Sequence, residues 1–162
     1  MLLLAQEPLR EPNHLAVNPR RYTMKSNLYH FYMGAAKLAA DMSYAKRLQV
    51  GAVIVTASGA MYPGYNGTLK GFPNVCELPD GSTDNAITVH AERNALYKML
   101  EEGVTARGAT MFVTHSCCEG CAQMTASVGI ERVVYLNDYK DMTPMTTLKK
   151  AGVIVEKYDG AI

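Results

Sequence analysis

The spacing of apolar positions divides this chain into alternating helical and extended segments. Apolar residues recur at the helical period from residue 25 to about residue 45 and predict one amphipathic helix. The unbroken apolar run at 50–55 predicts a strand buried on both faces, and a turn at 57–59 joins it to a second strand at 61–62. Residues 64–88 are rich in Gly, Pro, Asn and Asp without a period and predict a loop.

In the second half of the chain, periodic segments alternate with apolar, β-branched ones. Helices are predicted at 90–102, 118–128 and 143–151, each followed by a glycine suited to a C-terminal cap, and strands at 109–114, 132–136 and 153–156. This order predicts an α/β fold with a mixed sheet covered by helices on both faces. An antiparallel hairpin comes first, and right-handed helical crossovers join the later strands.

The length and composition fit one domain. With 162 residues, 48% of them hydrophobic, the chain can bury one complete core but not two, so we predict a single domain over residues 25–162. Residues 1–24 contain three prolines and no period, and they predict a poorly ordered N-terminal arm. The apolar opening gives way to Gln6 and Glu7, so we expect neither an export signal nor a membrane partner.

Charge and cysteine content limit the partners and the compartment. Sixteen basic and fifteen acidic residues give a net charge of +1, which does not favour a nucleic-acid partner but leaves a small anionic ligand open. Three of the four cysteines fall within residues 117–121, a spacing that suits a metal better than disulfides. We therefore expect a reducing, cytoplasmic location.

Two short motifs predict a catalytic zinc centre. His90, Cys118 and Cys121 offer one imidazole and two thiolates, and three protein ligands leave the fourth tetrahedral position to water. Cys118 and Cys121 lie about one turn apart at a predicted helix start, where the helix dipole favours thiolates. Glu92 is near enough to move protons without being a ligand. A purely structural zinc usually takes four protein ligands, and no fourth is evident.

These motifs resemble those of a known enzyme family. A histidine and glutamate in H-x-E, followed by C-x-x-C, form the signature of zinc-dependent nucleobase deaminases. In order along residues 25–157, VGAVIV, GYNG, NVCE, HAERNAL, ATMFVT, GIERVVY and AGVIVE resemble the deoxycytidylate (dCMP) deaminase family, and the loop CELPDGSTDN is as short as in its phage-type members.

The resemblance implies both a fold and a reaction. The expected fold is the three-layer α/β/α cytidine-deaminase fold with a five-stranded mixed sheet. The expected reaction is hydrolysis of dCMP to dUMP and ammonia, which supplies thymidylate synthesis. It also implies a homo-oligomer, often a hexamer, regulated by dCTP and dTTP with Mg²⁺ accompanying the allosteric nucleotide, and the host cytoplasm if the source is a phage.

The resemblance assigns the family's residue roles to the matching positions of this sequence. His90, Cys118 and Cys121 fall on the zinc ligands, and Glu92 falls on the proton shuttle. The remaining predicted substrate contacts are Asn66 for the deoxyribose, the Ala91 N–H and Ser116 carbonyl for the pyrimidine edge, and Arg47, Tyr139 and Lys140 for the phosphate. Without the metal motif, Asn66 would read as a turn residue and Arg47 as an ordinary cation near a helix end.

The chain departs from the family pattern at two places. Cys117 stands where proline usually precedes the first cysteine ligand, and Leu69 stands where proline is common. We exclude Cys117 as a ligand because adjacent residues rarely both bind one ion. We expect Cys76 to be a buried thiol and His115 a structural histidine. The alternative functions are deamination of dCTP, of free cytidine or deoxycytidine, or of a polynucleotide, and a catalytically silent binding module.

Overall fold

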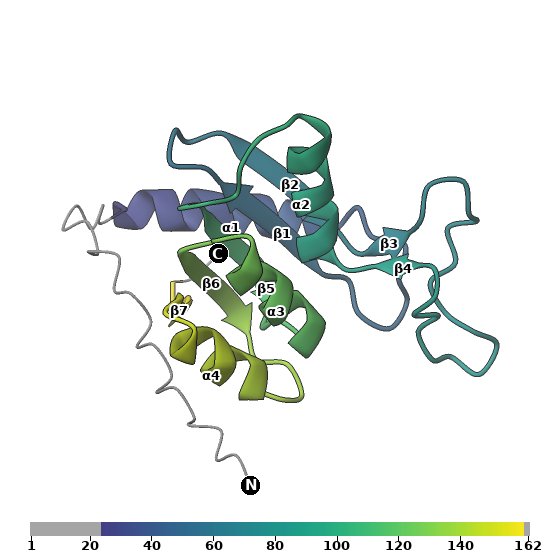
Figure 1. The fold of residues 1–162 in the computed structure, drawn as a ribbon. Helices are drawn as coiled ribbons and strands as arrows, with labels where there is room; N and C mark the ends of the chain where they lie inside the picture. The colour runs from purple at the N-terminus through teal and green to yellow at the C-terminus, as the bar shows by residue number, and fades with distance from the viewer. Residues whose placement is uncertain (1–23, 161–162) are drawn as a thin grey trace, which may run out of the picture.

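A five-stranded mixed sheet forms the centre of the molecule. The computed structural model describes residues 24–160, so the predicted N-terminal arm, apart from Met24, lies outside the described residues. The strand order is β2-β1-β5-β6-β7 (Figure 1), with β1 antiparallel to both neighbours and β5, β6 and β7 parallel. The strands are β1 (Gly51–Val55), β2 (Met61–Tyr65), β5 (Thr110–His115), β6 (Arg132–Asn137) and β7 (Ile154–Lys157).

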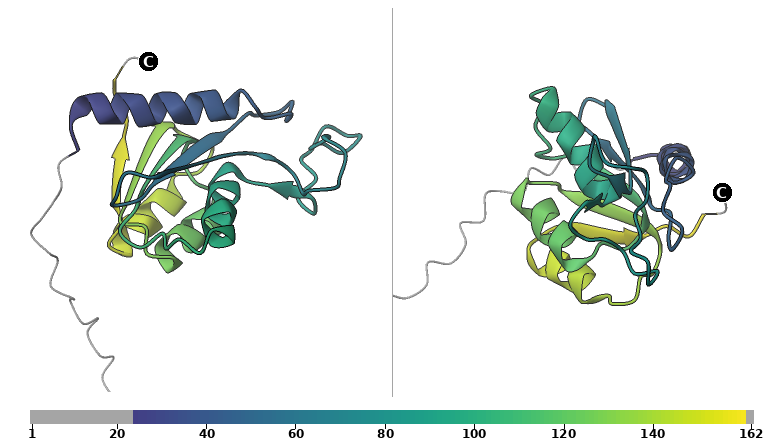
Figure 2. Two further views of the ribbon diagram at one scale, coloured as in Figure 1. Left: turned by 90° about the horizontal axis from the view of Figure 1, so that it is seen from above. Right: turned by 90° about the vertical axis from the view of Figure 1, so that its right-hand side faces the viewer.

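Four helices cover the two faces of this sheet. α1 (Ser26–Ala40) lies alone on one face (Figure 2), while α2 (Ala91–Glu101), α3 (Glu119–Ser127) and α4 (Thr143–Lys150) lie on the other. The predicted three-layer α/β/α architecture with a five-stranded mixed sheet is therefore confirmed. No helix among residues 24–160 has both the length and the apolar character needed to cross a membrane.

Alternate residues of the central strands contribute side chains to two separate hydrophobic cores. On the side of α2, α3 and α4, Ala52 and Ile54 of β1 pack with Met111 and Val113 of β5. On the α1 side, Val53 and Val55 pack with Phe112. All five residues of β1 are buried. The unbroken apolar run at 50–55 thus has the burial on both faces that it predicts.

Two glycines let helices press directly onto the sheet. A Cβ atom on Gly51 would overlap the backbone of Ala36 and Ala40 in α1. A Cβ on Gly64 would overlap the backbone of Ala91 and Ala95 in α2. The first turn of α2 therefore rests against β2, which fixes the height of that turn above the sheet.

The stretch predicted as a loop contains a second, two-stranded sheet. β3 (Gly67–Thr68) pairs with β4 (Thr88–Val89), and the segment between them extends away from the main sheet (Figure 1). We call residues 69–87 the projecting loop. Two hydrogen bonds from backbone N–H groups to one Glu77 carboxylate oxygen tie it to the chain before β1, from Lys46 at 2.7 Å and from Arg47 at 3.2 Å. The loop prediction therefore missed two short strands.

Candidate active site

His90, Cys118 and Cys121 converge at the starts of two neighbouring helices. His90 is the N-cap of α2, Cys118 is the N-cap of α3, and neither cap makes a side-chain hydrogen bond to its own helix. Both residues have the extended backbone angles that are usual at an N-cap, and their side chains are free of capping bonds. Cys121 follows in the first turn of α3. Their ligand atoms all lie within 4.8 Å of one another.

The spacing of these atoms fits one tetrahedral zinc ion. The Nδ1 atom of His90 lies 3.3 Å from Cys118 Sγ and 3.5 Å from Cys121 Sγ. Nitrogen and sulfur ligands bound to tetrahedral zinc at ordinary bond lengths lie about 3.6 Å apart. Among the residues that the structure describes, no other group of three His, Cys, Asp or Glu side chains meets the same distance limit. Cys117 is outside the group, as predicted.

Electrostatics within the cluster favour a cation. Hydrogen bonds with Cys121 and with His90 lower the pKa of Cys118 to about 3, so this sulfur is a thiolate. The hydrogen bond to Cys118 raises the pKa of His90, and the bond to the Cys118 thiolate also raises the pKa of Cys121. Protons on His90 and Cys121 would therefore compete with a metal ion for the same ligand atoms.

Glu92 is a buried carboxyl group beside the cluster. It belongs to the first turn of α2, two residues after His90, and is 4% exposed. Burial raises the pKa of Glu92 because the charged form loses its hydration. A carboxyl group with a raised pKa exchanges protons near neutral pH, as a general acid and base must.

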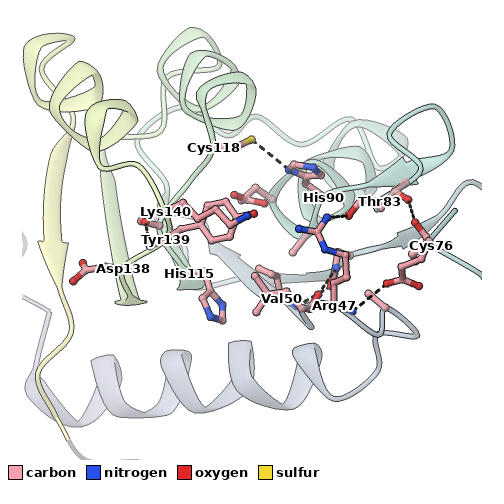
Figure 3. A pocket seen from close by; sticks show the side chains of 18 residues that line it. Arg47, Val50, Cys76, Thr83, His90, His115, Cys118, Asp138, Tyr139 and Lys140 are labelled. Atoms are coloured by element: carbon pink, nitrogen blue, oxygen red, sulfur yellow. Dashed lines mark hydrogen bonds between the residues drawn. The ribbon is translucent and has the colours of Figure 1, made fainter. Parts of the chain in front are cut away.

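A cavity of about 440 Å³ opens in front of the cluster (Figure 3). Small-molecule sites commonly have volumes of about 300–1,000 Å³. Nine of the ten predicted site residues line it, and the exception is Cys121, which is fully buried. The nine are Arg47, Asn66, His90, Ala91, Glu92, Ser116, Cys118, Tyr139 and Lys140.

Comparisons with known proteins identify the family. The family model for the cytidine and deoxycytidylate deaminase zinc-binding region matches residues 26–137. The chain belongs to this deaminase family. A deoxycytidylate deaminase from Mycobacterium phage D29 is 36% identical over 119 residues, which are 65% of this chain and 91% of the relative. The ComE operon protein 2 of Bacillus subtilis is 35% identical over 132 residues, 80% of this chain and 70% of the relative.

A solved relative shares the fold along nearly its whole length. The dCMP deaminase of cyanophage S-TIM5, crystallised with dCMP and dUMP, aligns with a TM-score of 0.80 and 41% identity. The alignment covers 83% of this chain and 99% of the cyanophage chain. The predicted cytidine-deaminase fold is confirmed, and the zinc-binding family region contains His90, Cys118 and Cys121.

In this deaminase, Asn66 also makes hydrogen bonds within the protein that stabilise the fold. Its side-chain carbonyl accepts a hydrogen bond from Val50 N at 2.7 Å, and its Nδ2 donates to Leu48 O at 2.8 Å. Its backbone carbonyl accepts from the Ser43 hydroxyl at 2.7 Å. The amide keeps one further N–H and one acceptor position for a ligand. Asn66 therefore holds the cavity wall before β1 as well as facing the cavity.

The predicted phosphate residues come from both sides of the cavity. Arg47 donates from Nη1 to the Thr83 hydroxyl of the projecting loop at 2.8 Å. Tyr139 and Lys140 follow β6, and the Tyr139 N–H donates to the Ser116 hydroxyl at 2.8 Å. Arg47, Tyr139 and Lys140 therefore reach one cavity from segments far apart in sequence (Figure 3).

The projecting loop and β4 add lining residues that the sequence pattern did not predict. Glu77 and Thr83 of the loop and Thr88 of β4 line the cavity with Cys76. Their positions depend on the β3–β4 pairing and on contacts with residues 46–47, which no local pattern signals. Cys76 is 1% exposed, and burial raises the pKa of its thiol, as expected for a buried structural cysteine.

His115 and Cys117 are neutral groups beside the site. The Thr114 hydroxyl accepts a hydrogen bond from Gly51 N at 3.1 Å and is hydrogen-bonded to Nδ1 of His115 at 3.2 Å. Burial lowers the pKa of His115. Cys117 is fully buried, and burial raises the pKa of its thiol, so it stays protonated. These contacts support a structural role for both residues, although His115 also lines the cavity.

Proposed function

We propose that this chain hydrolyses dCMP to dUMP and ammonia. The observation that carries the proposal is a three-ligand metal centre beside a buried carboxyl group, within a cavity large enough for a nucleotide. The relative solved with dCMP and dUMP supports this choice of substrate. The reaction adds water at C4 of the cytosine ring and releases the 4-amino group as ammonia.

The residues of the centre have different roles in the reaction. His90, Cys118 and Cys121 would hold zinc, which when bound supplies Lewis acidity and lowers the pKa of a water molecule. Glu92 would carry the first proton of the attacking water to ring N3, and then the proton of the new C4 hydroxyl group to the 4-amino group, which leaves as ammonia. The burial of Glu92 keeps bulk water from competing for these protons.

The remaining cavity residues would orient the nucleotide. The Ala91 N–H and the Ser116 carbonyl would read the pyrimidine edge, and the free Nδ2–H of Asn66 would bond the deoxyribose. Arg47, Tyr139 and Lys140 would contact the phosphate. A cation from each side of the cavity suits a monophosphate ester, and this favours dCMP over unphosphorylated deoxycytidine.

A substrate panel tests the proposal. Purified protein is offered dCMP, dCTP, deoxycytidine and a deoxycytidine oligonucleotide, and ammonia release is followed for each. We expect dCMP to have the highest kcat/KM. Turnover of deoxycytidine or dCTP with none of dCMP would reassign the substrate, and turnover of the oligonucleotide alone would favour a polynucleotide deaminase.

A substitution at Glu92 tests the assignment of the proton shuttle. We expect Glu92→Gln to lower kcat by about 10²- to 10⁴-fold, the usual contribution of a positioned general acid and base. Metal analysis should show that the variant still holds zinc. Glu119→Gln is the matched control because it makes the same change at an exposed carboxylate next to Cys118. A zinc-loaded Glu92→Gln protein with unchanged kcat would exclude Glu92 from the reaction.

Assembly, regulation and compartment stay predictions. The resemblance predicts a homo-oligomer, often a hexamer in this family, with dCTP activation and dTTP inhibition in the presence of Mg²⁺. Phage relatives favour action in a host cytoplasm. Repeating the dCMP assay with dCTP or dTTP, with and without Mg²⁺, tests the regulation. Unchanged rates at saturating effector would show that it is absent.

A further inference from the structure

Helix α1 is apolar on two opposite faces. One face packs on the sheet through Tyr32, Met33, Ala36, Ala39 and Ala40. The other face points away from the sheet (Figure 2). The exposed fractions on it are 57% for Phe31, 71% for Leu38 and 59% for Met42, which lies just past the end of the helix. A surface helix normally has one apolar face and a polar outer face. We call the outward set the outer stripe: Phe31, Gly34, Leu38 and Met42.

Gly34, in the middle of the outer stripe, has no explanation within the described chain. A Cβ atom added there would meet nothing within 4 Å, whereas a Cβ on Gly51 or Gly64 would overlap a neighbouring helix. Glycine in a helix interior costs stability relative to alanine. A small residue on an apolar helix face does, however, let the backbone of a second helix approach closely.

The exposed apolar area suits a protein interface. Phe31, Leu38, Met42 and the adjacent Tyr44, which is 57% exposed, each present on the order of 100 Å². Two copies together would bury about 800 Å² of apolar surface, close to the apolar share of a standard interface of about 1,600 Å². No charged residue lies within the outer stripe. The nearest charged residues, Lys37 and Asp41, lie along one flank of it.

We infer that the outer stripe is a self-association surface on which α1 of a second copy packs antiparallel, crossing at Gly34. Phe31 and Leu38 lie equally far from the midpoint between Gly34 and Ala35. A two-fold axis at that midpoint therefore packs Phe31 of each copy against Leu38 of the other. This self-complementary match favours a second copy over an unrelated partner. The inference concerns the face opposite α2 and α3 and does not depend on the proposed activity.

The mass of the full chain in solution tests this surface. Sedimentation velocity over a concentration series compares the wild type with Leu38→Glu and with Leu100→Glu. Leu100 is the matched control because it is 62% exposed on α2, on the other face of the sheet. We expect Leu38→Glu to raise the dissociation constant at least about thirtyfold, as for a central interface contact, and Leu100→Glu to leave it unchanged. Circular dichroism and zinc content verify that both variants fold.

Gly34 gives a second test with effects of opposite sign. Gly34→Gln should weaken association because its side chain blocks close approach of a second helix. In the Leu38→Glu background, the same change should raise Tm, because glutamine favours helix and meets open space. A wild type that is monomeric at high micromolar concentration, or association unchanged in Leu38→Glu or Gly34→Gln, would overturn the inference. Loss of deaminase activity with intact association would count against the proposed function alone.

Discussion

At the scale of single residues, Asn66 combines a ligand-facing position with a structural one. Its amide bonds the backbone of Leu48 and Val50, so it fixes the segment that leads into β1. A residue that only contacted the substrate would leave the stability of the free protein unchanged when replaced. Asn66 should affect both stability and substrate binding.

We expect Asn66→Ala to lower the free energy of unfolding by about 1–3 kcal/mol, because it leaves two partly buried backbone groups without partners. It should also raise KM for dCMP. Urea denaturation of the substrate-free protein measures the first effect, and steady-state kinetics measure the second. Ser43→Ala is a useful control, since it removes a bond to the Asn66 backbone and leaves the amide intact. A raised KM with unchanged stability would restrict Asn66 to ligand binding.

At the scale of elements, the contact between β2 and α2 sets the position of the catalytic residues. α2 begins directly after His90 and carries Glu92 in its first turn. Gly64 allows the backbone of that turn to touch β2. Any side chain at this position must push the start of α2 away from the sheet and away from α3.

Gly64→Ala and Gly51→Ala form a matched pair that tests this coupling. Both should destabilise the fold by about 1–3 kcal/mol through overpacking. Gly64→Ala should also weaken zinc binding at least about tenfold, because it displaces His90 relative to Cys118 and Cys121. Gly51→Ala displaces α1 on the opposite face and should leave zinc affinity unchanged. Equal losses of zinc affinity in both variants would contradict the coupling.

The local sequence pattern was sufficient to predict the regular helices and strands but not the residues that form the wall of the cavity. Periodicity and glycine caps predicted all four helices and the five strands of the main sheet, with ends that shift by a few residues. α1, for example, ends at Ala40 and not near residue 45. β3 and β4 were missed because each has two residues and is defined by pairing across the projecting loop. Glu77 and Thr83 reach the cavity through that same pairing.

The metal ligands were predictable for a different reason. Their residue types and spacing are dictated by the coordination chemistry of zinc, which is independent of the surrounding fold. The hydrogen bonds that occupy the Asn66 amide had no such signal, because the residues involved, Ser43, Leu48 and Val50, are joined by tertiary structure alone.

At the scale of the whole molecule, the metal centre links α2 to α3 across one face of the sheet. Zinc bound at 100 times its dissociation constant would stabilise the folded state by about 2.7 kcal/mol. Protons on His90 and Cys121 compete with zinc, and the raised pKa of His90 keeps its proton bound to a higher pH than in a free histidine. As pH falls through this raised pKa, zinc affinity falls and its stabilising effect is lost.

We therefore expect a chelator to lower Tm more at about pH 8 than at about pH 6, at one fixed zinc concentration. Thermal melts with and without chelator at the two pH values measure this difference. Cys121→Ser should abolish most of the chelator effect at both pH values. A chelator effect that is equal at both pH values, or larger at about pH 6, would show that proton competition does not govern this centre.

The helix starts at His90 and Cys118 involve a trade-off between stability and function. Ser, Thr, Asp or Asn at an N-cap typically adds about 1 kcal/mol, whereas neither His90 nor Cys118 makes a capping bond. Selection for heat resistance alone would favour replacing both residues, and the replacements would remove two of the three metal ligands. A program to stabilise this deaminase should therefore hold residues 90 and 118 fixed and seek its gains elsewhere.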